Sequence, residues 1–320
     1  IDGMPSSLCG IPMFIEPFIL TPASMNDYTG IPGYLSRWGY QTAFFHGANR
    51  GSMGFLAFAN KIGFQKYYGR QDYAQDKRFG GDADFDGNWG IWDEPFLQYY
   101  CAKMSEMKQP FMTALFTVSS HHPFVVPDKY KGSLKEEQLP IHKCIRYTDM
   151  AIGRFFETAR KQAWFKNTIF ILVSDHTNQS NHQQYKTDIG EFSAPFILYD
   201  PSGEIKPGMR AGIAQQIDIM PTIFGILGYN KPYFSFGCDL LNTPPQQTYA
   251  LNYINGVYQY TKNGYTMQFD GNRVTGIYSL KDLLMQHNLL GKVPEQAQME
   301  QELKAIIYQY MYRMVNNELR

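Results

Sequence analysis

Residues 168–176, which read TIFILVSDH, give the clearest structural signal in this sequence. The stretch is almost continuously hydrophobic up to Val173, which is typical of a strand buried on both faces of a parallel sheet. Ser174, Asp175 and His176 follow at once. In open α/β sheets, ligands bind outside the carboxyl ends of the strands. The stretch therefore predicts a fold class and also the position of a site.

Three further apolar runs have the same character. They lie at residues 40–45, before His46; at residues 111–118, before SSHHP; and at residues 195–199, before Asp200. Helical periodicity appears between and after them, at residues 142–162 and 215–227. In the first of these helices the apolar side is expected to hold Ile145, Met150, Ile152, Phe155 and Phe156. Alternating strands and helices predict a doubly wound α/β fold with a mainly parallel central sheet.

The sequence changes character after about residue 245. Asn255-Gly256 and Asn263-Gly264 separate short runs rich in Tyr, Val, Ile and Thr, which is a strong hairpin signal. We expect an antiparallel meander over residues 246–280 and one amphipathic helix from Glu295 onward. Its apolar side should hold Ile306, Ile307, Tyr310, Met311 and Met314. We therefore divide the chain into a catalytic core at 1–245 and a C-terminal subdomain at 246–320.

Composition excludes some functions. The 320 residues include 44% hydrophobic and 16% aromatic residues, and the net charge is zero, so no electrostatic case for nucleic acid exists. No apolar run approaches the ~18 residues of a membrane span. The four cysteines lack the short spacing of zinc ribbons or thioredoxin motifs. Buried thiols and a disulfide both remain open.

Three histidines occupy equivalent places, because His46, His121 and His176 each follow a predicted buried strand. A lone histidine is more often a hydrogen-bonded structural residue. Three of them, one preceded by Asp175, favour a shared site. Adjacent Asp and His side chains can both reach one divalent ion. A carboxylate with an imidazole suits Mn²⁺ or Zn²⁺ better than Ca²⁺.

Seven segments carry a family resemblance. They are residues 1–5, 39–47, 87–94, 119–124, 146–149, 174–176 and 216–222. In this order and spacing, they resemble the lipoteichoic acid synthase group of the alkaline phosphatase and sulfatase superfamily, over nearly the whole chain. The resemblance implies an α/β three-layer sandwich whose central sheet is mainly parallel, with a small C-terminal antiparallel meander and helix.

The resemblance also implies roles for individual residues. Asp175 and His176 match two metal ligands, for one divalent ion that we expect to be Mn²⁺, with Zn²⁺ or Mg²⁺ as alternatives. His121 matches a catalytic histidine that contacts the transferred group, and His46 matches another that lines the site. Gram-positive relatives have a Trp and an Arg where Met53 and Phe55 stand here. We therefore expect Asn49 and Arg50 to contact the substrate instead.

Two elements of the family pattern are expected upstream. The Thr or Ser nucleophile should immediately precede Ile1, and a glutamate ligand should come earlier still, after the first strand. We accordingly expect this chain to be most of the extracytoplasmic catalytic domain of a longer protein. By analogy, upstream helices anchor that protein, and the domain faces the periplasm or the cell exterior.

The implied function is metal-dependent transfer or hydrolysis of a phosphoryl-linked head group, of phosphoglycerol or phosphoethanolamine type, on an envelope lipid or glycan. The hydroxyl nucleophile attacks phosphorus to form a covalent phospho-enzyme. An alcohol or water then takes the phosphoryl group from the enzyme. Sulfuric ester hydrolysis on glycans is one alternative, although Cys9-Gly10-Ile11-Pro12 lacks the arginine of the formylglycine motif. A catalytically inactive family member is another.

A weaker signal lies at residues 82–87, DADFDG, with Asp93 eleven residues after Asp82. The pattern approaches a calcium-binding loop, but the last position should be glutamate. We interpret it as a structured surface loop, with a second cation site as the alternative. The neighbouring Trp89 and Trp92 favour packing over a sugar-binding platform.

Overall fold

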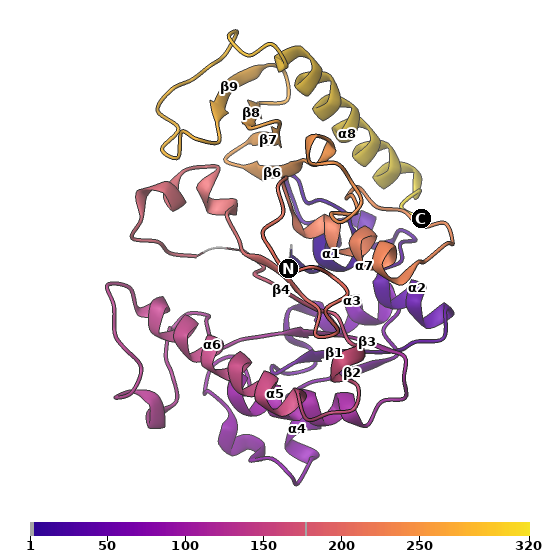
Figure 1. Ribbon diagram of the computed structural model, residues 1–320, viewed down its shortest axis with the longest axis vertical. Coiled ribbons are helices and arrows are strands. Elements are labelled where there is room, and N and C mark those ends of the chain that lie inside the picture. Colours follow the sequence, from indigo (N-terminus) through magenta and orange to yellow (C-terminus); the bar gives the residue numbers. More distant parts are fainter. Residues whose placement is uncertain (1–2, 177) are drawn as a thin grey trace. The chain divides into compact units, whose positions relative to one another are not determined.

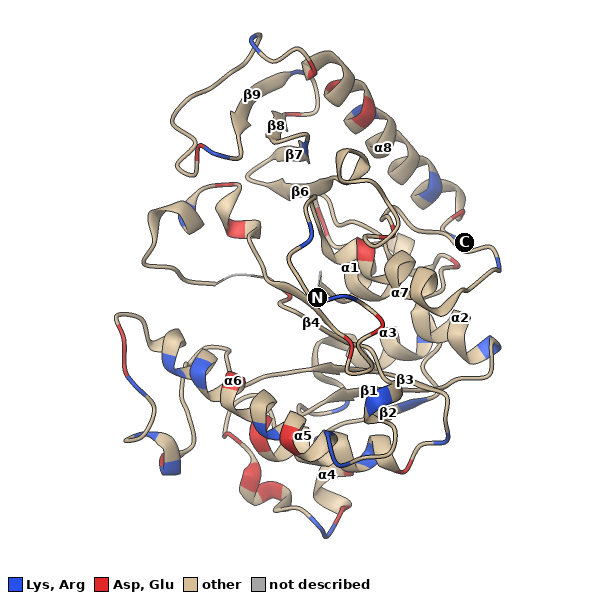
Figure 2. Cartoon of the chain, in the orientation of Figure 1, with Lys and Arg blue, Asp and Glu red and all other residues tan. Residues whose placement is uncertain are grey.

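The structure is a computed structural model that describes residues 3–176 and 178–320, so Ile1, Asp2 and Thr177 lie outside the described residues. The chain divides into two compact units (Figure 1). We call residues 32–170 and 199–206 the parallel-sheet unit. Residues 1–31, 171–198 and 207–320 form the meander unit. Acidic and basic residues are interspersed along both units, as the zero net charge suggests (Figure 2).

A three-stranded parallel sheet organises the first unit. Strand β1 (Gln41–His46) lies between β2 (Lys66–Tyr68) and β3 (Phe111–Phe116), and it pairs in parallel with both. Ala43, Phe44 and Phe45 are all buried, so both faces of β1 are covered. This confirms the prediction of a doubly covered strand for the run at residues 40–45, whereas β3 and the strand at 170–173 are only partly buried and Ile197 is 51% exposed. The register places His46 opposite Phe116.

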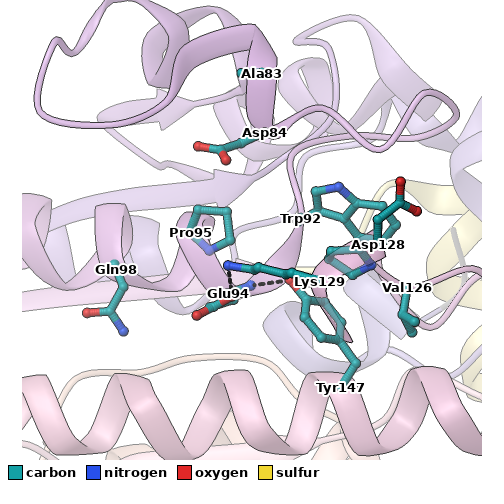
Figure 3. Close-up of a pocket in the computed structure, with 11 residues that line it drawn as sticks. Ala83, Asp84, Trp92, Glu94, Pro95, Gln98, Val126, Asp128, Lys129 and Tyr147 are labelled. Carbon is teal, nitrogen blue, oxygen red and sulfur yellow. Dashed lines mark hydrogen bonds and ion pairs between the residues drawn. The ribbon is translucent and has the colours of Figure 1, made fainter. Parts of the chain in front are cut away.

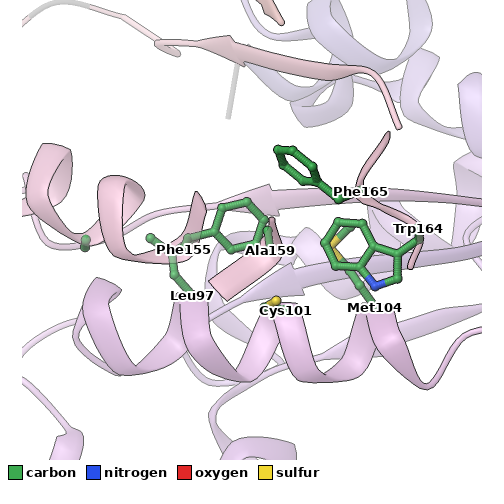
Figure 4. Close-up of a cluster of buried hydrophobic side chains, with 8 residues drawn as sticks. Leu97, Cys101, Met104, Phe155, Ala159, Trp164 and Phe165 are labelled. Atoms are coloured by element: carbon green, nitrogen blue, oxygen red, sulfur yellow. The ribbon is translucent and has the colours of Figure 1, made fainter. Parts of the chain in front are cut away.

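Two helices and the turn after the second supply a core cluster of this unit (Figure 4). Helix α5 (Asp93–Ser105) lies beside α6 (Pro140–Ala159). Burying each large apolar side chain contributes about 1.5–3 kcal/mol. The remaining helices of the unit are α2 (Ile31–Arg37), α3 (Phe55–Ile62) and α4 (Arg70–Gln75). The buried members of the cluster are Leu97, Cys101, Met104, Ala151, Phe155, Ala159, Trp164 and Phe165.

The meander unit contains the predicted C-terminal elements. Its antiparallel sheet has the order β6 (Ala250–Ile254), β7 (Val257–Lys262), β8 (Tyr265–Phe269) and β9 (Val274–Ser279). The two Asn-Gly turns have positive φ at both residues: 53° and 82° at Asn255-Gly256, and 51° and 82° at Asn263-Gly264. Such turns match the twist of paired strands, and Asn and Gly adopt positive φ most readily. This confirms the predicted meander.

The rest of the meander unit surrounds the end of β4 (Phe170–Val173), which pairs with β5 (Phe196–Tyr199). Both strands cross the boundary between the units. The helices here are α1 (Gly3–Cys9), α7 (Ile219–Leu227) and α8 (Gln296–Asn316). Among the described residues, no helix combines the length and apolarity of a membrane span. All four cysteines are free thiols.

Two helix faces differ from expectation. Ile145 is 51% exposed, because α6 turns Ile141, Cys144 and Tyr147 inward instead. In α8, Met299, Leu303, Tyr310 and Met314 are buried, but Met311 is half exposed. Each helix has more apolar residues than its neighbours can cover, so periodicity alone did not select the buried ones.

The predicted α/β class, with a parallel sheet and a C-terminal antiparallel sheet, is nevertheless confirmed. The division at residue 245 stays a prediction.

Candidate functional site

The Asp175-His176 pair follows β4 in the meander unit, and two contacts fix its backbone. The side-chain Nε2 of Gln216 donates to the carbonyl oxygens of Ser174, at 2.9 Å, and of Asp175, at 2.8 Å. On the other side, a Cβ added to Gly3 of α1 would lie 3.0 Å from the Cβ of Asp175. A larger residue at position 3 would therefore press on Asp175. Two of the motif segments, 1–5 and 216–222, thus support the third, 174–176.

The two side chains of the pair turn toward each other. Asp175 Oδ2 lies 3.4 Å from His176 Nε2, and the side chains are 34% and 64% exposed. Two ligands of one tetrahedral ion, each about 2.1 Å from it, are about 3.4 Å apart. The pair therefore fits two adjacent positions around one divalent cation. Among the described residues, no group of three or more His, Cys, Asp or Glu side chains completes such a site.

His46 ends β1 in the parallel-sheet unit and is almost fully buried, at 3% exposure. Its ring packs against Phe55 and Phe116, with centroids 4.9 and 5.3 Å away. Nδ1 lies 3.0 Å from the carbonyl oxygen of Phe116, and a carbonyl can only accept, so Nδ1 holds the proton. Burial lowers the pKa of His46, and the bond to Phe116 opposes this. His46 is therefore neutral at physiological pH, with its Nε2 lone pair available.

His121 lies on the exposed loop that follows β3, and Trp89 holds it there. The two ring centroids are 4.2 Å apart. The Trp89 Nε1–H donates to the His122 carbonyl oxygen at 2.6 Å, and His121 Nδ1 lies 3.0 Å from the same oxygen. The carbonyl again requires the proton on Nδ1. His46 and His121 thus follow adjacent parallel strands and share one tautomer, in which Nε2 remains available.

A buried carboxylate fixes the loop that leads to His121. Asp93 is 3% exposed and accepts from the backbone N–H of Val118 at 2.9 Å and of Ser119 at 3.3 Å. The Thr148 hydroxyl donates to it at 2.8 Å, and the Ser119 hydroxyl oxygen accepts from the Asp93 N–H at 2.9 Å. Burial raises the pKa of Asp93, and these hydrogen bonds oppose the rise. The network joins α5, α6 and the loop after β3.

Sequence reasoning did not recognise this role of Asp93. The signal was present, because residues 87–94 and 146–149 are both motif segments, and their Asp93 and Thr148 are bonded to each other. The other acids of the suspected calcium loop also have protein partners. Asp82 pairs with Arg70, Asp84 accepts from Tyr73, and Asp86 accepts from three backbone N–H groups. These partners favour a structured loop over a cation site.

Asn49 and Arg50 follow His46 on a loop that lies against the segment Trp89–Ile91. The backbone N–H of Ile91 donates to Gly47 O at 2.9 Å, and a Cβ at Gly90 would lie 2.6 Å from the carbonyl carbon of Gly47. Arg50 forms an ion pair with Asp72 through Nε and Nη2. The Gln71 side-chain amide donates to Asn49 Oδ1 at 3.2 Å. Both predicted contact residues are therefore held in defined positions.

A pocket of about 500 Å³ lies elsewhere in the parallel-sheet unit (Figure 3). Its walls combine Trp92 and Tyr147 with Asp84, Glu94 and Lys129. Glu94 is paired with Lys129, at 3.0 Å, and with Arg154, and it accepts from the Tyr130 hydroxyl at 2.8 Å. Burial raises the pKa of Glu94, but Lys129, Tyr130 and Arg154 together outweigh it and hold that pKa below its ordinary value. No predicted site residue lines this pocket.

The chain is similar in sequence and in fold to known proteins. Lipoteichoic acid synthase 1 of Bacillus subtilis (strain 168) is 26% identical over 267 residues, which are 77% of this chain and 40% of that protein. The chain thus spans about two fifths of the relative's length. A protein in the alkaline phosphatase superfamily from Vibrio parahaemolyticus superposes with a TM-score of 0.84, at 22% identity, over 99% of this chain and 76% of that one.

A second solved structure, the lipoteichoic acid synthase LtaP from Listeria monocytogenes, has a TM-score of 0.79 at 20% identity, and covers 98% of this chain and 80% of that one. These superpositions confirm the fold. The family model described as Sulfatase matches residues 2–229, which is well over half of the chain. The resemblance seen in the motif segments is therefore confirmed, and the chain belongs to the Sulfatase family of enzymes, within the alkaline phosphatase superfamily.

Proposed function

We propose that this chain supports metal-dependent transfer or hydrolysis of a phosphoryl-linked head group, of phosphoglycerol or phosphoethanolamine type, on an envelope lipid or glycan. The observation that carries the proposal is the 3.4 Å separation of Asp175 Oδ2 and His176 Nε2, which suits two ligands of one ion. Relatives named as lipoteichoic acid synthases support the choice of a lipid head group. The reaction would proceed through a covalent Thr or Ser phospho-enzyme.

Asp175 and His176 would hold the cation, for which Mn²⁺ is our first choice and Zn²⁺ or Mg²⁺ the alternatives. When bound, such an ion lowers the pKa of a hydroxyl nucleophile and stabilises negative charge on the nonbridging phosphoryl oxygens. Gln216 and Gly3 would keep Asp175 in place for this role, because they contact its backbone and Cβ. The nucleophile is expected in the longer protein, before Ile1.

The two other histidines would have different tasks. A neutral His46 with its proton on Nδ1 has only a lone pair on Nε2, so it would accept a proton from an alcohol or water rather than donate to a phosphoryl oxygen. His121 is exposed, and we propose that it protonates the leaving alkoxide. We propose Asn49 and Arg50 as substrate contacts. The Asp72 pair uses Nε and Nη2 of Arg50, which leaves Nη1 for a phosphate oxygen.

By analogy with the named relatives, we place this domain on the extracytoplasmic face of the membrane, with anchoring helices in the longer protein. Sulfate-ester hydrolysis is the second candidate, and the match to the Sulfatase family model favours it. Two chromogenic probes separate the candidates. Phosphotransfer predicts faster turnover of bis-p-nitrophenyl phosphate than of p-nitrophenyl sulfate, whereas a sulfatase predicts the reverse order.

The proposed phospho-enzyme can be tested by mass spectrometry of the full-length protein after incubation with phosphatidylglycerol or phosphatidylethanolamine. We expect one Thr or Ser peptide to gain the mass of the phosphorylated head group, and Asp175→Ala to abolish the gain. Asp282→Ala is the matched control, because Asp282 also pairs with a histidine on the surface, at 3.3 Å from His287 Nδ1. An unmodified peptide with every donor lipid would contradict the covalent mechanism.

A further inference from the structure

The loop that joins β9 to α8 exposes a cluster of leucines. Leu280, Leu283, Leu284 and Leu290 lie within eleven residues, and they are 36%, 57%, 45% and 42% exposed. Single exposed leucines are common on protein surfaces, but four within eleven residues concentrate apolar surface on one short loop. Concentrated apolar surface of this kind indicates an interaction surface. We call residues 280–292 the leucine loop; it follows β9 in Figure 1.

The leucine loop is held by its own hydrogen bonds. Asn288 Oδ1 accepts from the backbone N–H of Ile277 at 3.1 Å and of Leu290 at 3.0 Å, and its Nδ2 donates to Thr275 O at 3.2 Å. The Leu289 N–H donates to Ile277 O at 2.7 Å. Because these bonds tie the backbone to β9, the leucines are presented by a fixed frame. Their exposure is a feature of the fold.

The positive charges of the loop are exposed like its leucines, whereas its negative charge is mostly covered. Lys281 and Lys292 are exposed at its two ends. Its one carboxylate, Asp282, is 16% exposed and accepts from the His287 N–H at 2.7 Å. His287 is itself 78% exposed beside that carboxylate. The loop therefore presents leucines and cations outward, and its acid toward its own backbone.

This composition distinguishes between two kinds of partner. Protein interfaces are enriched in Tyr, Trp and Arg and depleted in Lys, because large rigid side chains give the most contact area. The leucine loop offers aliphatic side chains flanked by lysines. That combination is typical of surfaces that insert apolar groups below the phosphates of a bilayer while cations meet the phosphates.

We propose that the leucine loop docks on an anionic lipid surface, with Leu283, Leu284 and Leu290 inserted at the acyl boundary and Lys281 and Lys292 at the head-group phosphates. The docking is weak and reversible, because few apolar groups insert. It would orient the domain on a membrane. The inference does not depend on the proposed chemistry, because it concerns binding to the bilayer and not turnover of a head group.

Insertion can be followed in the whole chain with an environment-sensitive fluorophore on an introduced cysteine. Leu284→Cys reports on the loop, and Leu20→Cys, at an exposed leucine far along the chain, is the matched control. The chain without an introduced cysteine gives the background from Cys238, which is half buried. We expect emission at position 284 to rise with vesicles that contain phosphatidylglycerol, and to change little with phosphatidylcholine alone. Position 20 should respond to neither.

Substitutions then separate the two contributions in a vesicle co-sedimentation assay. Lys281→Gln should weaken binding about fivefold, since each basic residue near an anionic surface contributes about that factor. Leu283→Asp should weaken it about tenfold or more, because it removes an inserting group and adds a negative charge. Leu20→Asp should have no effect. Circular dichroism and thermal melting verify that each variant is folded.

Three outcomes would overturn the proposal. The first is a folded chain whose position 284 does not respond to anionic vesicles. The second is an equal response at position 20, which would indicate non-specific adsorption. The third is a dimer in sedimentation velocity that Leu283→Asp dissociates, which would assign the loop to a second copy of the chain.

Discussion

Two candidate site histidines, one in each unit of this protein, lie in opposite environments. In the parallel-sheet unit, His46 is 3% exposed, and the Phe116 carbonyl fixes its tautomer. In the meander unit, the His176 side chain is 64% exposed and faces the Asp175 carboxylate. Burial keeps an imidazole neutral, whereas a ligand that receives an ion from solvent has to be accessible. From this comparison we propose proton chemistry for His46 and cation binding for the Asp175-His176 pair.

The largest effect is expected where the parallel-sheet unit fixes the His121 loop. Asp93→Ala leaves the N–H groups of Val118 and Ser119 and the Thr148 hydroxyl without their buried acceptor. We expect a loss of about 3 kcal/mol in the free energy of unfolding, measured in urea. Asp86→Ala is the control, because Asp86 also accepts from three N–H groups but near solvent, where water replaces it. A loss there should stay below about 1 kcal/mol. Equal losses would contradict the assigned role of Asp93.

An intermediate effect is expected where the meander unit supports its carboxylate. Gly3→Ala places a Cβ only 3.0 Å from Asp175 Cβ, so Asp175 has to shift. We expect Mn²⁺ affinity to fall about tenfold, as for other residues that orient a metal ligand. The control is Gly153→Ala in α6, where an added Cβ meets nothing within 4 Å. That variant should gain up to about 1 kcal/mol in stability and keep its metal affinity. Unchanged affinity in Gly3→Ala would show that the close approach is unimportant.

The sequence predicted the elements that have local signals, and it missed features that depend on distant contacts. Continuous apolar runs located β1, β3 and β4, and the Asn-Gly pairs located the meander turns, because both signals are local. Strand β2 was missed because it has three residues, beginning with the exposed Lys66. Asp93 was read as part of an acidic loop, since burial of a carboxylate depends on α6 and the loop after β3, which are distant in sequence.

The places of the candidate residues after their strands were predictable, but the chemistry of these residues was not. Strand ends predicted where His46, His121 and the Asp175-His176 pair would lie. Which imidazole nitrogen is available could not be predicted, because the partners are the carbonyls of Phe116 and His122, and these are set by strand register and by Trp89. The roles proposed for these residues, and for Asn49 and Arg50, stay predictions.

The smallest effect is a pH dependence. Burial lowers the pKa of His46, so the unfolded chain binds its proton more readily than the folded one. The stability that neutral His46 contributes is complete above the unfolded pKa of about 6.5 and is lost as the pH falls through the lower, folded value. His46→Asn, which can still donate to Phe116 O, should lose less stability between about pH 7.5 and about pH 5.5 than the wild type.

Wild type and His46→Asn are compared at each pH, because the titration of Asp218 changes the stability of both proteins in the opposite direction. Burial raises the pKa of Asp218 to about 7, against bonds from the N–H groups of Cys238 and Gln215. Its contribution is complete below the ordinary carboxyl pKa and is lost as the pH rises through about 7. Both proteins share this change. An identical acid-side slope in wild type and His46→Asn would mean that His46 is not held neutral by burial.

The most direct test of the account is calorimetric titration of Mn²⁺ into the full-length protein. We expect binding of a single ion, weakened more than about a hundredfold by Asp175→Ala or His176→Ala, since each removes a ligand. Asp282→Ala, which disrupts an Asp–His pair of similar separation on the leucine loop, should leave the affinity unchanged. Retained affinity in Asp175→Ala, or an equal loss in Asp282→Ala, would contradict the claim that Asp175 and His176 form the cation site.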